Sequence, residues 1–435
     1  MLVEAAESSP PRQNRPMPVH TAHRDITRVL AAETVSNFGS MLSRLAIPWL
    51  AALQLSATPA QMALLLVADV LAAALGALLL GPWVERRGKR AVMLLADALR
   101  LLVLAVLAWA TWQGRITFGG LLLAAAASGG LSTAFELARS AWLAQRVPVD
   151  ELPRRNAQLS VAGSLSETAA FAIGGWLYQG LGAALALLLD ALSYAASALC
   201  LRGVAEAPPA MDTAQAERSS AAPGWRATLR MAWQDATMGL RTVLAHTRLR
   251  AVLGIETLLG FGMALTGTVY TIYVTRDLGL PTGELGVIAA LGGLGAVLGA
   301  SAAPALGRHV GPGRAMALGL LALAAGTACL PMAQGMGWAA VAWLVAHQIV
   351  GDAGHTLHGV HDRTLRQTAV PASQLARTDA GLRAAGHWAT LAGAGAGAWL
   401  GTVADSRAVL WLAAASALAA AALAAARLVE RRVAS

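Results

Sequence analysis

The chain has 435 residues, of which 56% are apolar and only 13% charged, and its mean hydropathy is +0.56. An average soluble domain carries about 25% charged residues, so this composition excludes an ordinary soluble enzyme. The net charge of +9 comes from arginines scattered in short clusters between apolar runs, which is typical of membrane topology and not of a nucleic-acid-binding surface. Cys200 and Cys329 lie in separate apolar runs, so neither a disulfide framework nor a Cys-x-x-Cys metal or redox pair is indicated.

Apolar runs of roughly 20 residues follow one another along the chain, each long enough to cross about 30 Å of hydrocarbon as a helix. We predict twelve spans, at about 29–53, 60–82, 91–112, 116–138, 156–179, 182–202, 249–274, 283–306, 314–334, 338–361, 378–401 and 407–428. The expected protein is therefore an all-α membrane protein of two six-helix bundles, at 26–202 and 249–428. We also predict three segments outside the bundles, which are a disordered cytosolic tail at 1–25, a cytoplasmic central loop at 203–248 and a short cytosolic tail at 429–435.

The basic residues predict the orientation of these spans, because Lys and Arg accumulate in cytoplasmic loops. With both termini in the cytoplasm, the outside loops hold only Arg115, Arg276 and Arg407. The central loop contains a basic, amphipathic segment at 225–246, which suits a helix lying on anionic lipid. Docking to a partner is the alternative for this segment.

The two halves resemble each other at one constant offset of 223 residues. This offset pairs Glu33 with Glu256, and it pairs "VPVDELPRRNAQL" at Val147 with "VPASQLARTDAGL" at Val370. Six helices repeated in the same orientation form a parallel repeat, with a pseudo-twofold axis along the membrane normal and a binding site between the halves. The repeat therefore predicts alternating access.

A loop motif points to a known family. The sequence "GPWVERRGKRAVM" between the second and third spans resembles the loop signature of the major facilitator superfamily, with a glutamate where the family usually has aspartate. A weaker copy, "APALGRHVGPGRAM" at Ala303, lacks the acidic residue. Charged groups at the cytoplasmic rim can pair across a moving interface in one state and separate in the other. The motif residues are therefore gate candidates, and the alternative is that they only fix topology: Gly81, Glu85, Arg86, Gly88, Lys89 and Arg90.

The resemblance covers about residues 26–430, and finer details look like the macrolide and enterobactin exporter branch, such as "SNFGSMLSRLAIPWLAALQL" in the first span. It implies efflux of amphipathic small molecules in exchange for protons, by a protein that works as a monomer in the bacterial inner membrane. In the fifth span, Ala170 and Phe171 replace a Gly-Pro pair that many drug antiporters of the superfamily carry.

Acidic residues inside the spans are the candidates for proton coupling, because they are costly there unless they are paired or functional. Burial raises the pKa of a carboxyl group toward neutrality, as loading and release of a proton require. Our first choice is Asp69, which has no obvious partner nearby in the sequence, followed by Glu33, Glu256 and Asp352. For Glu33 and Glu256, pairing with a nearby arginine is the structural alternative.

Further polar and aromatic side chains are expected to line a central cavity. Glu33, Asn37, Ser40 and Arg44 form one polar stripe along the first span. Asp97 and Glu136 each have an arginine three residues later, a spacing usually found in structural ion pairs. Four histidines lie in the tenth span, but their spacing does not favour a metal site. The other cavity candidates are Glu136, Arg139, Tyr270, Tyr273, His347 and His355.

The sequence has no G-x-x-x-x-G-K-[ST] loop, so we do not expect it to bind ATP. We also expect no cofactor and no nucleic-acid partner. This favours a secondary carrier whose coupling ion is H+. One alternative is a dedicated exporter of a single metabolite such as a siderophore. Another is a membrane enzyme or a non-transporting sensor, for which the histidines of the tenth span are the only support.

Overall fold

The computed structural model describes residues 19–148, 151–206, 225–335 and 337–429. The first half, here called the N-bundle, contains α1 (Val19–Trp49), the π-helical turn η1 (Leu50–Gln54), α2 (Pro59–Arg86), α3 (Lys89–Trp112), α4 (Phe118–Arg146) and α5 (Leu152–Arg202). The second half, the C-bundle, contains α8 (Thr247–Ile272), η2 (Tyr273–Asp277), α9 (Thr282–Val310), α10 (Pro312–Met332), α11 (Trp338–Ala369), α12 (Ala372–Val403) and α13 (Ser406–Arg427). Between them lies α7 (Trp225–Ala245).

The long helix α5 supplies two of the predicted spans. Its backbone leaves helical geometry at Gly182, where φ is 82° and ψ is 165°. Glycine adopts a positive φ without the clash that a Cβ atom would cause, so it can join two helices through a single residue. With α5 divided here, the chain has the twelve predicted membrane helices, and the prediction of an all-α protein of two bundles is confirmed.

Composition alone identifies fewer of these spans. Among the described residues, eight helices are long and apolar enough to cross a membrane, and the segment of α5 is one of them. The helices α1, α11 and α12 are not among these eight, and each carries charged side chains, such as Glu33, Asp352 and Arg383. Their polar side chains form the candidate site described below.

One predicted boundary differs from the structure. α1 begins at Val19, inside the segment predicted to be a disordered tail at 1–25. The rest of that tail (1–18), much of the central loop (207–224) and most of the last tail (430–435) lie outside the described residues.

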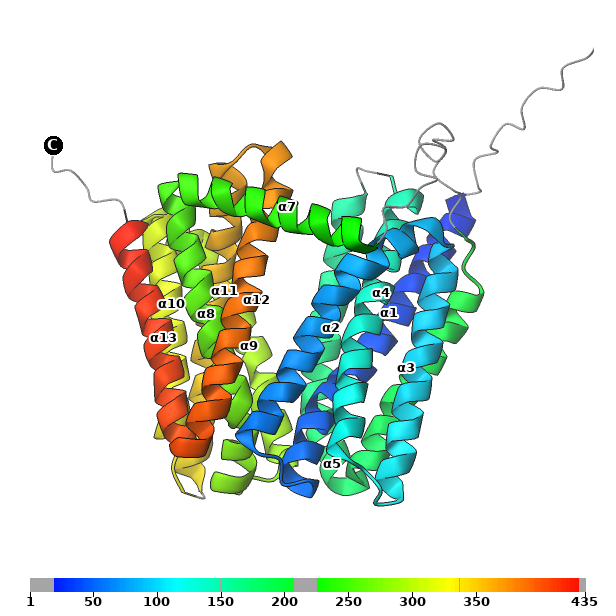
Figure 1. Cartoon of the computed structure of the whole chain (residues 1–435), viewed down its shortest axis with the longest axis horizontal. Helices are drawn as coiled ribbons and strands as arrows, with labels where there is room; N and C mark the ends of the chain where they lie inside the picture. Colours follow the sequence, from blue (N-terminus) through cyan, green and yellow to red (C-terminus); the bar gives the residue numbers. More distant parts are fainter. Residues whose placement is uncertain (1–18, 149–150, 207–224, 336, 430–435) are drawn as a thin grey trace, which may run out of the picture.

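The two bundles are in contact at the end of the molecule opposite α7, here called the closed end (Figure 1). There the backbones of α5 and α9 approach so closely at Gly175 and Gly286 that a Cβ atom at either position would overlap the other helix. The backbone N–H of Gly283 donates to the Gln179 side chain at 2.8 Å. From this end the bundles diverge toward α7, so the space between them widens on the side here called the α7 face.

The glycine contact gives a testable expectation. Gly175→Leu should force α5 and α9 apart, because its side chain would meet the Thr282 carbonyl and the Gly286 backbone. A cysteine introduced at Gln179 should then react faster with a membrane-impermeant maleimide. Gly180→Leu is the matched control, since a Cβ atom there meets nothing within 4 Å. Equal labelling of the two variants would contradict the assigned contact.

The two π-helical turns occupy equivalent places in the halves. η1 (50–54) and η2 (273–277) end the first helix of each bundle and differ by the repeat offset of 223. They meet at the closed end, where the Arg276 side chain donates through Nε to the Ala52 carbonyl at 3.0 Å. Trp49, the last residue of α1, is buried beside this contact and packs edge-on against Tyr178.

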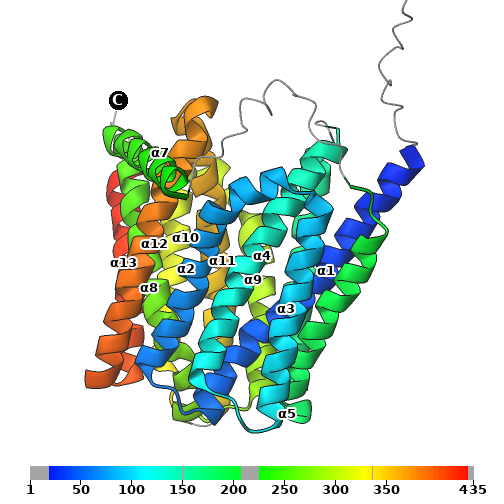
Figure 2. The same cartoon turned by 45° about the vertical axis from the view of Figure 1, so that its right-hand side comes forward.

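The amphipathic segment of the central loop is the helix α7, which crosses the α7 face from the C-bundle toward α2 (Figures 1 and 2). It packs on α12 at Gly239, where a Cβ atom would overlap the Arg377 carbonyl. Its Trp233 side chain is exposed. α7 is therefore anchored to the C-bundle and leaves part of its apolar surface uncovered.

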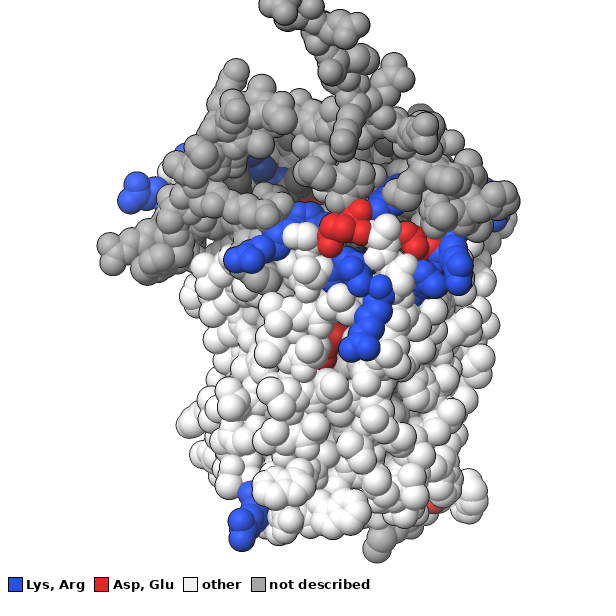
Figure 3. Space-filling view, turned by 90° about the vertical axis from the view of Figure 1, so that its right-hand side faces the viewer, with Lys and Arg blue, Asp and Glu red and all other residues white. Residues whose placement is uncertain are grey.

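The charged side chains are unevenly distributed between the two ends. In Figure 3, Lys, Arg, Asp and Glu form a band near the α7 face, and the surface below it is almost free of charge. The indole rings of Trp112 and Trp338 lie exposed toward the closed end, where aromatic residues often mark a membrane interface. The uncharged surface between these ends is the part of the molecule that spans the membrane.

Candidate functional site

The polar stripe on α1 lines a small cavity within the N-bundle. Glu33, Asn37, Ser40 and Arg44 all contribute to this space of about 100 Å³, together with Glu136 of α4. The Ser40 hydroxyl also bonds the Tyr194 hydroxyl at 3.0 Å. The spacing of the stripe therefore places its four members on one wall, as expected for residues three and four apart on a helix.

Glu33 forms an ion pair with Arg139 of α4, and both side chains are largely buried. The sequence spacing suggested Glu136 as the partner of Arg139, and this is wrong. Glu136 is exposed, whereas the Arg139 side chain reaches across to α1. A buried charge needs a counter-charge more than an exposed one does, so the carboxylate in the bundle interior takes the arginine.

The C-bundle has an equivalent ion pair on equivalent helices. Glu256 of α8, the repeat partner of Glu33, accepts from Arg366 of α11 at 2.6 Å. Arg366 also pairs with Asp362 on its own helix and, at 3.7 Å, with Asp379 of α12. The C-bundle therefore gathers three carboxylates around one guanidinium group, where the N-bundle has one.

A cavity of about 400 Å³ lies beside this C-bundle network, between α8, α11 and α12. Its wall combines apolar side chains such as Leu259 and Met263 with ionisable ones. Because α8 and α12 are also the helices that pack against α2, the cavity lies on the side of the C-bundle that adjoins the N-bundle. Its polar lining residues include Glu256, His355, His358, Asp362, Arg363, Arg366, Arg383 and His387.

Two candidate acids have no such arginine. Asp69 of α2 is partly buried against Gly129 of α4, and it makes no hydrogen bond or ion pair with another described residue, although the charge of Arg44 acts on it at longer range. Asp352 of α11 lies against Gly292 of α9, and its charge interacts with that of Glu167 on α5. Asp69 and Asp352 are therefore carboxylates at helix–helix contacts, without a direct counter-ion in the described part of the chain.

The ion pair between Asp97 and Arg100 lies deep in the N-bundle. The guanidinium group donates to Asp97 at 2.5 Å, and the Ser197 hydroxyl donates to the same carboxylate at 2.7 Å. The Arg100 group also lies over the rings of Phe135 and Tyr194, at 4.8 and 4.3 Å. Both charges are almost fully buried, which indicates a structural role.

Asp97→Ala should lower the free energy of unfolding by about 3–5 kcal/mol, because it leaves the Arg100 charge buried without a partner. Thermal unfolding in detergent measures the effect. The control is Glu136→Ala, which removes an exposed carboxylate and should change stability by less than about 0.5 kcal/mol. Similar melting temperatures for the two variants would contradict the structural role.

The aromatic and histidine candidates have different environments. Tyr273 was expected to line the cavity, and this is wrong: it is buried, and its hydroxyl donates to the Ala333 carbonyl. Tyr270 lies beside the His347 ring, which bonds the Gly326 carbonyl at 2.9 Å. His355 lines the C-bundle cavity. Among the described residues, no three His, Cys, Asp or Glu side chains are grouped so as to hold a metal ion.

The loop-motif residues are partly described. The side chains of Gly81, Glu85 and Arg86 lie outside the described part. Lys89 donates to the Val84 carbonyl at 2.7 Å. Arg90 donates to the Leu201 and Arg202 carbonyls at the end of α5. With the bundles apart on the α7 face, these bonds of Lys89 and Arg90 stay within the N-bundle.

Comparison with known proteins gives one family and one fold. The model of the Major Facilitator Superfamily matches residues 29–377, whereas the curated proteins give no match. A variant of the nucleoside transporter NupG superposes with a TM-score of 0.73 at 14% identity, covering 93% of this chain and 99% of that one.

Two other solved structures show the same fold. A bacterial homologue of the iron transporter ferroportin, in an inward-facing state, has a TM-score of 0.71 at 17% identity and covers 92% of this chain and 98% of its own. The POT family transporter PepTSo has a TM-score of 0.68 at 15% identity, with 93% and 97% covered.

Twelve membrane helices in two repeated bundles, with charged cavities on their inner helices, define a multi-pass membrane transporter and not an enzyme. The chain belongs to the Major Facilitator Superfamily.

Proposed function

We propose that the protein exports amphipathic small molecules across the bacterial inner membrane in exchange for protons. The C-bundle cavity carries this proposal, because its volume of about 400 Å³ lies in the range of drug-sized ligand sites. Its wall offers apolar contact at Leu259 and Met263 beside charged groups, as an amphipathic compound requires. Asp69 and Asp352 supply the acids for proton exchange.

The proposed orientation places the α7 face in the cytoplasm. The concentration of Lys and Arg at that face supports it, because basic residues collect on the cytoplasmic side. The closed end then faces outward, and the bundles diverge toward the cytoplasm, from which an exporter takes its substrate. In this orientation α7 lies at the cytoplasmic membrane surface, with the exposed Trp233 available for lipid.

The proposal is tested with the purified full chain, as a monomer, in liposomes with a preset pH gradient. Addition of chemically unrelated amphipathic compounds should release protons, and empty liposomes should not respond. Proton release with a single metabolite class only, such as siderophores, would indicate a dedicated exporter instead of a broad one. If the folded protein released no protons with either the amphipathic compounds or the siderophores, proton-coupled export would be overturned.

A further inference from the structure

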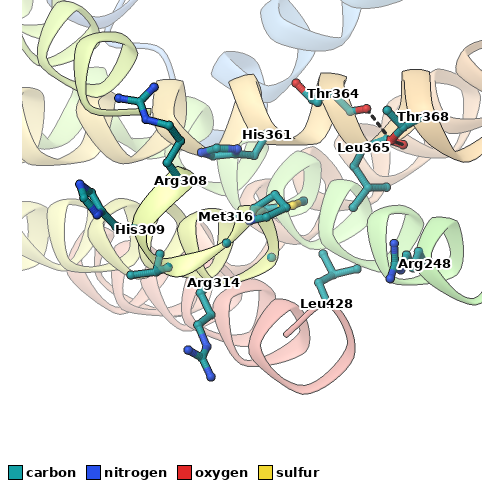
Figure 4. A pocket seen from close by; sticks show the side chains of 14 residues that line it. Arg248, Arg308, His309, Arg314, Met316, His361, Thr364, Leu365, Thr368 and Leu428 are labelled. Carbon is teal, nitrogen blue, oxygen red and sulfur yellow. Dashed lines mark hydrogen bonds between the residues drawn. The ribbon is translucent and has the colours of Figure 1, made fainter. Parts of the chain in front are cut away.

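A second charged cavity lies at the α7 face of the C-bundle, away from the space between the bundles. It has a volume of about 460 Å³ and is centred on the turn where α9 ends and α10 begins (Figure 4). Met316, Leu365 and Leu428 supply its apolar wall. The turn belongs to the second copy of the loop motif, the copy whose acidic residue is absent.

The ionisable side chains that line this cavity are all basic, and three of them are arginines. Its lining includes Arg248, Arg308, His309, Arg314 and His361, and no Asp or Glu is among the residues that line it. Arg308 and Arg314 make no hydrogen bond or ion pair with another described residue. The side chains of Arg308 and Arg314 leave the turn in different directions (Figure 4).

The backbone adds to this positive potential. α10 begins at Pro312 after Gly311, which has a φ of 85° and provides no side-chain cap. The first N–H groups of a helix have no partner within it, and the helix dipole places partial positive charge at the same end. The N–H groups of Gly313 and Arg314 are in this first turn, as in many sites that bind phosphate.

His361 contributes a polar side chain to the wall of the cavity. Its side chain is 7% exposed, and its Nε2 atom is buried without a hydrogen-bond partner among the described residues. Figure 4 shows the ring between Arg308 and Met316, on the wall of the cavity.

We propose that this cavity binds a phosphate-bearing anion, which is either the headgroup of an anionic phospholipid or a soluble phosphate compound. Arginine forks match phosphate oxygens in geometry and charge, and the α10 N-terminus supplies further donors. A neighbouring cavity of about 260 Å³ contains Arg250 and Arg427, so the basic surface continues across the ends of α8 and α13. The site lies outside the proposed transport route, and its test does not depend on transport.

Both sources are tested on the purified full chain by binding. Native mass spectrometry compares retention of phosphatidylglycerol with retention of phosphatidylcholine, and a thermal-shift titration uses inorganic pyrophosphate against sodium chloride of equal ionic strength. The test variant is Arg308→Gln with Arg314→Gln. Arg154→Gln with Arg202→Gln removes the same charge from exposed positions of the N-bundle at the same face and serves as the control.

If the anion is a lipid headgroup, the test variant should hold phosphatidylglycerol at least about tenfold more weakly than wild type, since each lost guanidinium contact is charge-assisted. If the anion is soluble, pyrophosphate should raise the melting temperature of wild type and not of the variant. Arg308→Lys with Arg314→Lys keeps the charge and should recover part of either effect. The proposal would be overturned if the glutamine variant bound both probes as tightly as the wild type does. It would also be overturned if the control variant lost as much binding as the test variant.

Discussion

Asp69→Asn should abolish proton release evoked by substrate while the protein stays folded. Asp69 makes no ion pair or hydrogen bond with another described residue, whereas Glu33 and Glu256 are each held by an arginine. A carboxylate without a counter-ion can take up and release a proton without breaking a salt bridge, which is what a coupling group must do. We expect proton flux to fall at least about tenfold, within the range found for positioned proton-transfer groups.

The same variant distinguishes coupling from binding. Exchange of labelled for unlabelled substrate across the membrane needs no net proton movement, so Asp69→Asn should retain it. Glu284→Gln, at an exposed position in the first turn of α9 at the closed end, removes a similar charge and should leave both activities unchanged. Loss of exchange together with proton release would place Asp69 in substrate binding, and normal proton release would exclude it as the coupling acid.

Arg366→Gln should be the most damaging single change in the C-bundle. It leaves Glu256, Asp362 and Asp379, which come from three different helices, without the guanidinium group that they share. Uncompensated buried charges of this kind cost about 3–5 kcal/mol. We expect a large fall in the melting temperature, measured in detergent, and a loss of transport.

Arg139→Gln is the matched change in the N-bundle, where only Glu33 loses its partner. It should therefore destabilise the protein less than Arg366→Gln does. Adding Asp362→Asn to Arg366→Gln removes one of the stranded charges and should restore part of the stability. Equal effects of the two arginine changes, or no rescue by Asp362→Asn, would show that the three-carboxylate cluster is not held by Arg366.

The fold was predictable because hydropathy and the repeat are local patterns in the chain. Most of the twelve spans follow from apolar runs of sufficient length. The more polar helices α1, α11 and α12 were predicted as spans because the loops beside them are short and the repeat supports them. The two spans of α5 were predicted, but the single-residue junction at Gly182 was not, because a glycine between two apolar runs reads equally well as part of a longer loop. Its positive φ is visible only in the structure.

The contacts of the site were predictable only in part. The offset of 223 paired Glu33 with Glu256, and it could have directed attention to arginines on the fourth helix of each half. Arg139 and Arg366 are one helical turn out of repeat register, so the pattern search did not connect them. Tyr273 was misplaced because a tyrosine in an apolar span can face a cavity or the core, and only tertiary packing decides between them.

The contact between η1 and η2 also shows how the two halves can differ. Leu53 occupies the position that Arg276 has in the second half, so the arginine is present on one side of the pseudo-twofold axis only. A symmetric dimer of identical half-length chains would have to bring two arginines, or none, to this point. A single fused chain does not have that constraint. The second half donates a hydrogen bond from Arg276 and the first half accepts it at the Ala52 carbonyl. Each half can therefore change its sequence independently at a contact that both halves share.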